Sequence, residues 1–248
     1  MNDADQDTTE MLDEQPTRGN RLYPRVTSFR SRRGALTEPQ QLTWDRLWPQ
    51  LGRDVGDDRL DIDAWFGRSA PVVLEIGSGT GTAAVSMARA EPSVNLIAVE
   101  VYRPGLAQTL QRIERTLDTD SPVTNLRILR GDAVEVLEKM LAPASLTGVR
   151  VFFPDPWPKA RHHKRRLVQP ANVALLRSRL APGGQLHCAT DWPPYAEAML
   201  AALSADPQLR NLAGDGYAPR PARRPPTRYE QRGIAAGRPV ADLHFVRC

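Results

Sequence analysis

Short apolar runs alternate with longer helical patterns between residues 72 and 204, and this alternation constrains the fold more than any other feature. The first run, VVLEIG, is rich in β-branched residues and stops at glycines, as buried strands do. We expect strands at 72–77, 95–101, 125–133, 149–153 and 185–191, and helices at 82–92, 104–118, 133–141, 167–180 and 195–204. Strands that alternate with helices in this way predict an α/β fold, a mostly parallel sheet with helices on both faces.

The net charge of +4 on this chain of 248 residues is unevenly distributed. Residues 1–17 hold six acids and no Lys or Arg, whereas residues 18–33 hold six arginines and no acid. The acidic start buries too little apolar surface to order itself. We therefore expect a mobile tail over 1–35 and a single domain over 36–248.

The alternating pattern fades after residue 206. The segment PRPARRPPTRYEQRG (219–233) is rich in Pro and Arg and predicts a loop. The last apolar run, LHFVR (243–247), predicts an edge strand.

The composition disfavours a membrane protein and a disulfide-rich protein. No run of about 18 apolar residues is present, and the acidic start lacks the basic and apolar regions of a signal peptide. The two cysteines, Cys188 and Cys248, provide neither a disulfide framework nor a metal quartet. We expect a cytoplasmic protein that contacts no membrane and holds no metal, while a monomer and a homodimer both stay open.

A glycine-rich segment, EIGSGTG (75–81), ends the first predicted strand. Gly77, Gly79 and Gly81 allow a tight turn and a close approach of the backbone to a ligand. A dinucleotide site would need its third glycine at position 82, where Thr82 stands. Glu75 repels a pyrophosphate and suits a cationic ligand such as S-adenosyl-L-methionine, which carries a sulfonium and an ammonium. The alternative is a strand-to-helix turn that binds no ligand.

Two further acids stand at the carboxyl ends of the next two predicted strands. Glu100 is placed to accept hydrogen bonds from both hydroxyls of a ribose, and Asp132 to accept one from the adenine amino group. Ligands of parallel α/β sheets bind at this edge. Together with the glycine segment, these acids resemble the class I S-adenosylmethionine-dependent methyltransferases over roughly residues 70–205, which implies a Rossmann-like fold.

A narrower resemblance rests on three segments: PDPWPKARHHKRRL (154–167), TDW (190–192) and TRYEQRG (227–233). Together they resemble the bacterial tRNA (guanine-N7-)-methyltransferases, the TrmB family, over about residues 70–248. The resemblance implies that the cofactor or active site is contacted by Glu75, Glu100, Asp132 and Asp155. It also implies that the substrate is contacted by Lys159, Asp191, Thr227, Arg228, Tyr229 and Glu230. The family usually has T-K-F-E where this chain has T-R-Y-E, a change that keeps charge and aromaticity.

The loop after the fourth predicted strand is stiff and strongly basic. Pro154, Pro156 and Pro158 fix three φ angles and hold Asp155 and Trp157 at the edge of the sheet. The ring of Trp157 either stacks on an extruded base or anchors the loop by packing. The cations from Lys159 to Arg166 either contact phosphates, which we favour, or form a solvated surface.

The chemistry that follows from the resemblance is methyl transfer to N7 of a guanosine in tRNA. N7 is already a lone-pair nucleophile, so positioning matters more than a strong base. We expect Asp155 to be the catalytic carboxylate, which either stabilises the positive charge that develops on the base or positions the base by a hydrogen bond to the guanine edge. The alternatives are a methyltransferase for another RNA or a protein amine, and a non-catalytic RNA-binding protein; Thr82 weakens a third, a nicotinamide dehydrogenase.

Overall fold

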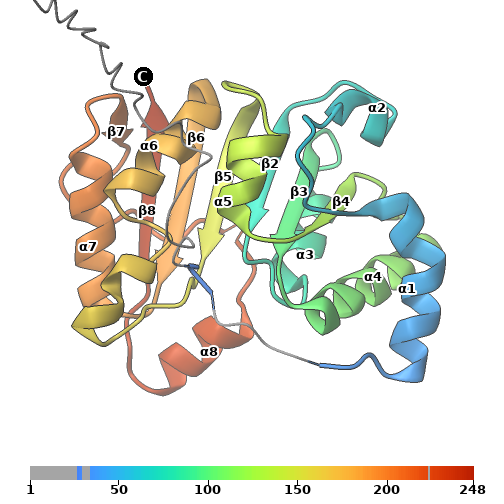
Figure 1. Cartoon of the computed structure of the whole chain (residues 1–248). Coiled ribbons are helices and arrows are strands. Elements are labelled where there is room, and N and C mark those ends of the chain that lie inside the picture. Colours follow the sequence, from blue (N-terminus) through green and yellow to red (C-terminus); the bar gives the residue numbers. More distant parts are fainter. Residues whose placement is uncertain (1–26, 30–33, 223) are drawn as a thin grey trace, which may run out of the picture.

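The computed structural model describes residues 27–29, 34–222 and 224–248, which form an eight-stranded sheet flanked by helices (Figure 1). The sheet order is β1-β4-β3-β2-β5-β6-β8-β7. The strands are β1 Gly52–Asp54, β2 Val72–Ile76, β3 Asn95–Glu100, β4 Leu126–Arg130, β5 Leu146–Phe152, β6 Leu180–Thr190, β7 Leu209–Asn211 and β8 Ala241–Arg247. The six strands from β1 to β6 in this order are parallel, whereas β8 and β7 run antiparallel to their neighbours.

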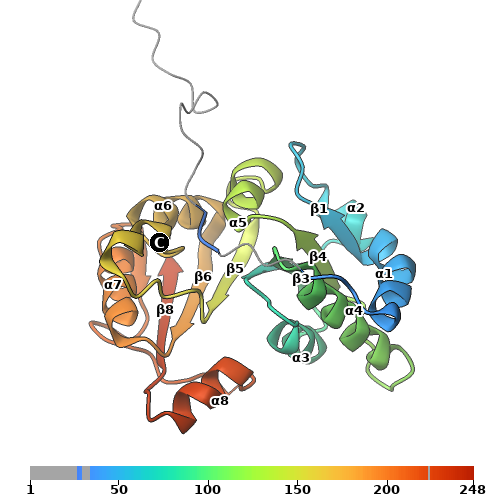
Figure 2. The same ribbon diagram turned by 60° about the horizontal axis from the view of Figure 1, so that its bottom comes forward.

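All the α-helices except α8 lie against the two faces of the sheet. The α-helices are α1 Glu38–Leu51, α2 Ile62–Phe66, α3 Thr82–Ala90, α4 Arg103–Leu117, α5 Ala133–Glu135, α6 Pro170–Arg179, α7 Pro193–Ser204 and α8 Arg228–Ala235. Of the two largest core clusters, one joins one face of the sheet to α1, α3 and α4, and the other joins the opposite face to α2, α5, α6 and α7 (Figure 2). Helix α8 belongs to neither layer and lies beyond the carboxyl ends of the parallel strands.

The order of the strands reverses at β2. The chain moves outward from β2 through β3 and β4, and then returns to form β5 on the other side of β2. Because their crossover helices lead away in opposite directions, the carboxyl ends of β2 and β5 frame a crevice where ligands of such sheets bind.

The five strands and five helices expected between residues 72 and 204 are confirmed, with shifted ends. The helix expected from 167 begins at Pro170, and the helix expected over 133–141 is α5 followed by a π-helical turn, Val136–Met140. The segment Pro182-Gly183-Gly184, between the expected helix 167–180 and the expected strand 185–191, lies inside β6, which begins at Leu180.

Two expectations for the C-terminal region are wrong. The expected loop 219–233 contains the first part of α8, whose start carries a capping box between Thr227 and Glu230. The expected edge strand 243–247 belongs to β8, which lies between β6 and β7. The edge position belongs to the three-residue strand β7, which the sequence pattern did not reveal.

The expectation of a mobile tail over 1–35 falls mostly on residues outside the described ones and stays a prediction. Within the described ranges, no helix is both long and apolar enough to cross a membrane.

Candidate active site

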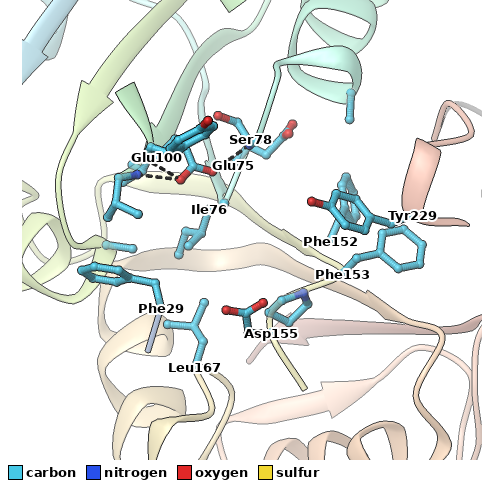
Figure 3. A pocket seen from close by; sticks show the side chains of 18 of the residues that line it. Phe29, Glu75, Ile76, Ser78, Glu100, Phe152, Phe153, Asp155, Leu167 and Tyr229 are labelled. Atoms are coloured by element: carbon cyan, nitrogen blue, oxygen red, sulfur yellow. Dashed lines mark hydrogen bonds between the residues drawn. The ribbon is translucent and has the colours of Figure 1, made fainter. Parts of the chain in front are cut away.

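A cavity of about 340 Å³ opens at the carboxyl ends of the central strands (Figure 3). Its walls come from the glycine segment after β2, the ends of β3 and β4, the loop after β5, the start of α8 and the short segment Ser28–Phe29. Glu75 and Glu100 face this space from one side, and Asp155 faces it from the other (Figure 3). The cavity therefore collects most of the acids that the sequence pattern singled out.

The glycine segment takes a backbone conformation that side chains disfavour. The φ angles of Gly77, Gly79 and Gly81 are 77°, 58° and 74°. A Cβ atom added at Gly81 would lie 2.4 Å from Oγ1 of Thr109 in α4, whereas one added at Gly79 would meet nothing within 4 Å. Gly81 thus lets helix α4 approach the segment, while Gly79 leaves room on the side of the cavity.

Glu100 ties the glycine segment to the end of β3. Its Oε2 accepts a hydrogen bond from the backbone N–H of Gly79 at 2.9 Å. Its Oε1 accepts from the N–H groups of Val101 at 2.7 Å and Tyr102 at 3.0 Å. The carboxylate lines the cavity at the carboxyl end of β3, a position that suits the hydroxyls of a ribose.

Glu75 is a buried acid whose pKa is strongly shifted. Its side chain is only 2% exposed, and among the described residues its Oε2 has no hydrogen-bond partner. Burial raises the pKa of this carboxyl from 4.5 to about 7, although the charge of Arg150 on the neighbouring strand opposes the rise. An ammonium group in the cavity would both stabilise the carboxylate and occupy its free oxygen.

Asp132 lies at the carboxyl end of β4 and caps α5. Its Oδ1 accepts a hydrogen bond from the N–H of Val134 at 3.0 Å, and the side chain is 8% exposed. The carboxylate lines the cavity. Its position suits the adenine amino group that the sequence pattern assigned to it.

The loop after β5 brings Asp155 to the cavity on a strained backbone. Phe153 and Trp157 have φ angles of 51° and 46°, a region that bulky side chains seldom enter. Asp155 lies between them, half-buried, and lines the cavity. Such strain is common at active sites, where the surrounding structure holds it in place.

Trp157 is a packing anchor and not a stacking platform for a base. The ring is 3% exposed, and its Nε1 donates a hydrogen bond to the carbonyl of Ser28 at 3.2 Å. The guanidinium of Arg165 lies over the ring, 3.8 Å from its centroid. Of the two interpretations left open by the sequence, the structure supports packing.

The basic run from Lys159 to Arg166 is divided between two roles. Arg165 donates to the carbonyls of Thr27 at 3.1 Å and Phe29 at 2.8 Å, and so fixes the short segment 27–29 against the loop. Arg166 is 6% exposed and donates to the carbonyl of Pro156 at 2.9 Å. These two arginines are structural, which corrects the expectation that the whole run contacts phosphates. Lys159, Arg161 and Lys164 are exposed.

The residues expected to contact substrate fall into two groups. Thr227 and Tyr229 line the cavity, and the ring of Tyr229 is 55% exposed. Glu230 instead is 1% exposed and accepts hydrogen bonds from Arg220 and Arg224, so its carboxylate faces the protein interior. The expectation of direct substrate contact by Glu230 is therefore not met in this arrangement.

Asp191 lies at the carboxyl end of β6 and supports helix α8. Its Oδ2 accepts a hydrogen bond from Nε of Arg238 at 2.9 Å. The backbone of α8 approaches so closely that a Cβ added at Gly233 would lie 2.9 Å from the same oxygen. The side chain of Arg228, also expected to contact substrate, lies outside what the structure describes.

The sequence pattern missed several residues that line the cavity. Phe29 reaches it from the arginine-rich segment, and Phe152 and Phe153 reach it from the end of β5 (Figure 3). Arg232 reaches it from α8, one turn after Tyr229. The helical spacing from Tyr229 to Arg232 would have indicated a shared face once the capping box T-R-Y-E had been interpreted as a helix start.

Ligand binding should be linked to ionisation of Glu75. Because its raised pKa keeps the carboxyl largely protonated below pH 7, a cationic ligand should expel a proton there. The affinity for S-adenosylmethionine should rise between about pH 6 and 7.5, a range in which the ligand's own amine stays mostly charged. Calorimetry in buffers of different ionisation enthalpy measures the proton released.

The Glu75→Gln variant should lose this pH dependence, whereas Glu197→Gln, an exposed change on α7, should keep it. The same linkage gives the sign for stability. Without ligand, the contribution of the neutral carboxyl is complete below pH 4.5 and is lost as the pH rises through about 7. Proton release that is unchanged in Glu75→Gln would contradict the assignment.

Replacing the glycines one at a time should separate packing from ligand contact. An alanine in the left-handed backbone conformation lowers the free energy of unfolding by about 1–2 kcal/mol, so Gly79→Ala should destabilise the ligand-free protein by that amount. Gly81→Ala should cost more, because its Cβ overlaps Thr109. Gly79→Ala should show the larger loss of cofactor affinity. Thermal melting with and without S-adenosylmethionine checks both statements, and equal effects of the two variants would contradict them.

Solved methyltransferase structures share this fold. A variant of the 16S rRNA (adenine(1408)-N(1))-methyltransferase from Catenulisporales acidiphilia gives a TM-score of 0.50 at 16% identity, covering 76% of this chain and 91% of its own. TrmN from Thermus thermophilus gives a TM-score of 0.50 at 14% identity, covering 84% of this chain and 48% of its own. At these identities the likeness concerns the fold alone.

Sequence comparison shows the family. A family model described as a putative methyltransferase matches residues 69–243. The tRNA (guanine-N(7)-)-methyltransferase of Nocardia farcinica is 59% identical, covering 91% of this chain and 85% of its own length. The enzyme of the same name from Rhodococcus jostii is 58% identical, covering 98% of this chain and 93% of its own. The corresponding protein of Mycolicibacterium gilvum is 57% identical, covering 90% of this chain and 87% of its own length. The chain therefore belongs to the TrmB family of class I S-adenosylmethionine-dependent methyltransferases.

Proposed function

We propose that this protein transfers the methyl group of S-adenosyl-L-methionine to N7 of a guanosine in tRNA. The observation that carries the proposal is the identity of 57–59% with three tRNA (guanine-N(7)-)-methyltransferases over at least nine-tenths of the chain. The acid-lined cavity at the switch point of the sheet supports it independently. The same identity argues against the alternatives of another RNA, a protein amine or a non-catalytic role.

The residues around the cavity fit S-adenosylmethionine. We propose that the methionine part of this ligand lies close to the backbone of the glycine segment, which contains Gly77, Gly79 and Gly81. Glu75 then faces the ammonium, Glu100 the ribose and Asp132 the adenine, while Asp155 closes the cavity at the methyl end. The fit rests on Oε2 of buried Glu75, which has no hydrogen-bond partner in the described part of the chain, and on the space beside Gly79.

The aromatic residues beside Asp155 suit the target guanine. Phe152, Phe153 and Tyr229 gather at one end of the cavity (Figure 3). Stacking of a base on an aromatic face stabilises it by about 1–3 kcal/mol. We assign this role to the exposed ring of Tyr229, in place of the buried ring of Trp157.

The remaining polar groups suit the RNA backbone. We assign contacts with phosphates to the exposed cations Lys159, Arg161 and Lys164 and to Arg232, because an anionic polymer is attracted to such a surface. We assign the hydroxyl of Thr227 to the sugar or base edge. Asp191 and Glu230 then act by holding α8 in position.

The mechanism needs orientation more than proton transfer. When bound, S-adenosylmethionine supplies an electrophilic methyl group on a sulfonium. The ring of Tyr229 would present the lone pair of guanine N7 to that methyl group, while Glu75, Glu100 and Asp132 would hold the rest of the donor. The positive charge moves onto the base, where the carboxylate of Asp155 stabilises it. Orienting the two reactants can lower the barrier by about 7–11 kcal/mol.

We further propose that the enzyme works in the cytoplasm, where its tRNA substrate is found. Cys188 and Cys248 are both free thiols in the structure, which suits a reducing compartment.

The accepting atom can be tested with altered tRNA transcripts. Replacing guanosine by 7-deazaguanosine exchanges N7 for a carbon without a lone pair and barely disturbs base pairing. Such transcripts should bind this protein and accept no methyl group. Ordinary transcripts should gain a cationic guanosine that borohydride and aniline cleave. Methyl transfer to the deaza transcript at a normal rate would refute N7 as the nucleophile.

The charge of Asp155 should matter to chemistry more than to folding. The Asp155→Asn change keeps the size of the side chain and deletes the charge that faces the developing cation. The single-turnover rate should fall by about 100-fold while melting and tRNA affinity stay near those of the wild type. The matched control is Asp118→Asn, an exposed acid after α4 at the opposite edge of the sheet. Equal single-turnover rates for Asp155→Asn and the wild type would exclude the electrostatic role.

A further inference from the structure

Arg224 is a fully buried cation close to the active site. Its side chain is 0% exposed, and it is held by two carboxylates at once. Its Nη1 and Nη2 donate to the two oxygens of Glu230, each at 2.9 Å. Its Nε and Nη2 donate to the two oxygens of Asp242, each at 3.0 Å. Both pairs are bidentate, a geometry that fixes direction as well as distance.

The two carboxylates belong to different parts of the fold. Glu230 lies in the first turn of α8, the helix that carries Tyr229 to the cavity. Asp242 lies in β8 and is also hydrogen-bonded to Nε2 of His187 in β6, at 2.7 Å. The guanidinium of Arg224 therefore connects the helix α8 to the sheet.

The same guanidinium packs against the start of the loop that carries Asp155. It lies 5.7 Å from the ring centroid of Phe152 and 5.6 Å from that of Phe153. Both rings line the cavity, and Phe153 has the strained backbone that precedes Asp155. The side chain of Arg224 thus contacts both helix α8, which carries Tyr229, and the aromatic residues that precede Asp155.

The energetics of this arrangement indicate a role in geometry. Burying charges is costly, and a buried ion pair is often no more stabilising than a packed apolar cluster of the same volume. Burial alone would raise the pKa of Glu230. The hydrogen bonds from Arg220 and Arg224 outweigh this effect and hold the pKa of that carboxyl below its ordinary value. The carboxylates therefore stay ionised, and the network keeps its directional bonds.

We propose that Arg224 is a positioning residue for methyl transfer, which holds α8 and the loop carrying Asp155 at a fixed separation. This inference rests on the proposed function, since it concerns how the base on Tyr229 meets the methyl donor. The residue touches neither reactant. It acts by aligning helix α8, on which Tyr229 holds the base, with the loop that carries Asp155.

The test compares Arg224→Lys with the wild type in single-turnover methylation of tRNA at saturating protein and cofactor. Lysine keeps the charge but cannot make two bidentate pairs. Misplacing reactants by about 1 Å costs about 100-fold in rate, so a loss of about 10- to 100-fold is expected. The affinity for S-adenosylmethionine should stay within about twofold, because Arg224 contacts neither the glycine segment nor Glu75, Glu100 or Asp132.

The control is Arg177→Lys. Arg177 likewise bonds the side chains of two residues, with one hydrogen bond to Oδ2 of Asp206 at 2.8 Å and one to Oε1 of Gln208 at 2.7 Å, but it lies on α6, away from the cavity. This variant should lower the melting temperature and leave the single-turnover rate unchanged. A common loss of rate in both variants would attribute the effect to lowered stability and overturn the inference.

A double-mutant cycle with Tyr229→Ala separates positioning from general support. If Arg224 acts by placing Tyr229, the rate loss caused by Arg224→Lys should be much smaller when Tyr229 is already absent. A purely structural role predicts the same factor in both backgrounds, and that result would overturn the inference. If Arg224→Lys fails to fold, Asp242→Asn replaces it in the double-mutant cycle with Tyr229→Ala, and the same two outcomes are compared. A wild-type protein that methylates no tRNA would instead refute the proposed function.

Discussion

The reversal of strand order at β2 is the constraint on which the rest of this structure depends. Since β3 and β5 flank β2 and their crossovers lead in opposite directions, the carboxyl ends of β2 and β5 stay open between them. Every acid assigned to the cofactor lies on this edge, and so does Asp155. The glycine segment is needed there because α4 approaches it so closely that Gly81 has no room for a side chain.

Charge at this edge is arranged by depth. Glu100 is held as an acceptor by three backbone N–H groups, whereas Glu75 lies deeper and its pKa is raised to about 7 by burial. Cationic side chains, in contrast, gather outside the cavity on the loop after β5. An arrangement with acids inside and cations outside suits a cationic cofactor in the interior and an anionic RNA on the surface.

The sequence predicted the central part of the fold well, because alternation of strands and helices is a local pattern that burial on both faces reinforces. It predicted the positions of Glu100 and Asp132 for the same reason, since the ends of parallel strands meet at one edge. It failed for the C-terminal region, where the start of α8 depends on a single capping box and β7 is only three residues long. The burial of Trp157 could not be predicted, because its partners come from Ser28 and Arg165, and only one of them is near in sequence.

The strain in the loop after β5 is explained by what holds it. The left-handed backbone at Trp157 is kept in place by burial of the ring, by its hydrogen bond to Ser28 and by the guanidinium of Arg165. Arg165 in turn donates hydrogen bonds to the carbonyls of Thr27 and Phe29, so the segment 27–29 and the loop fix each other. Because guanine N7 carries no proton and needs no general base, the reaction is accelerated mainly by reactants that are already oriented. The protein therefore stabilises a stiff loop, and the proline residues on both sides of Asp155 reduce the entropy that ordering it would cost.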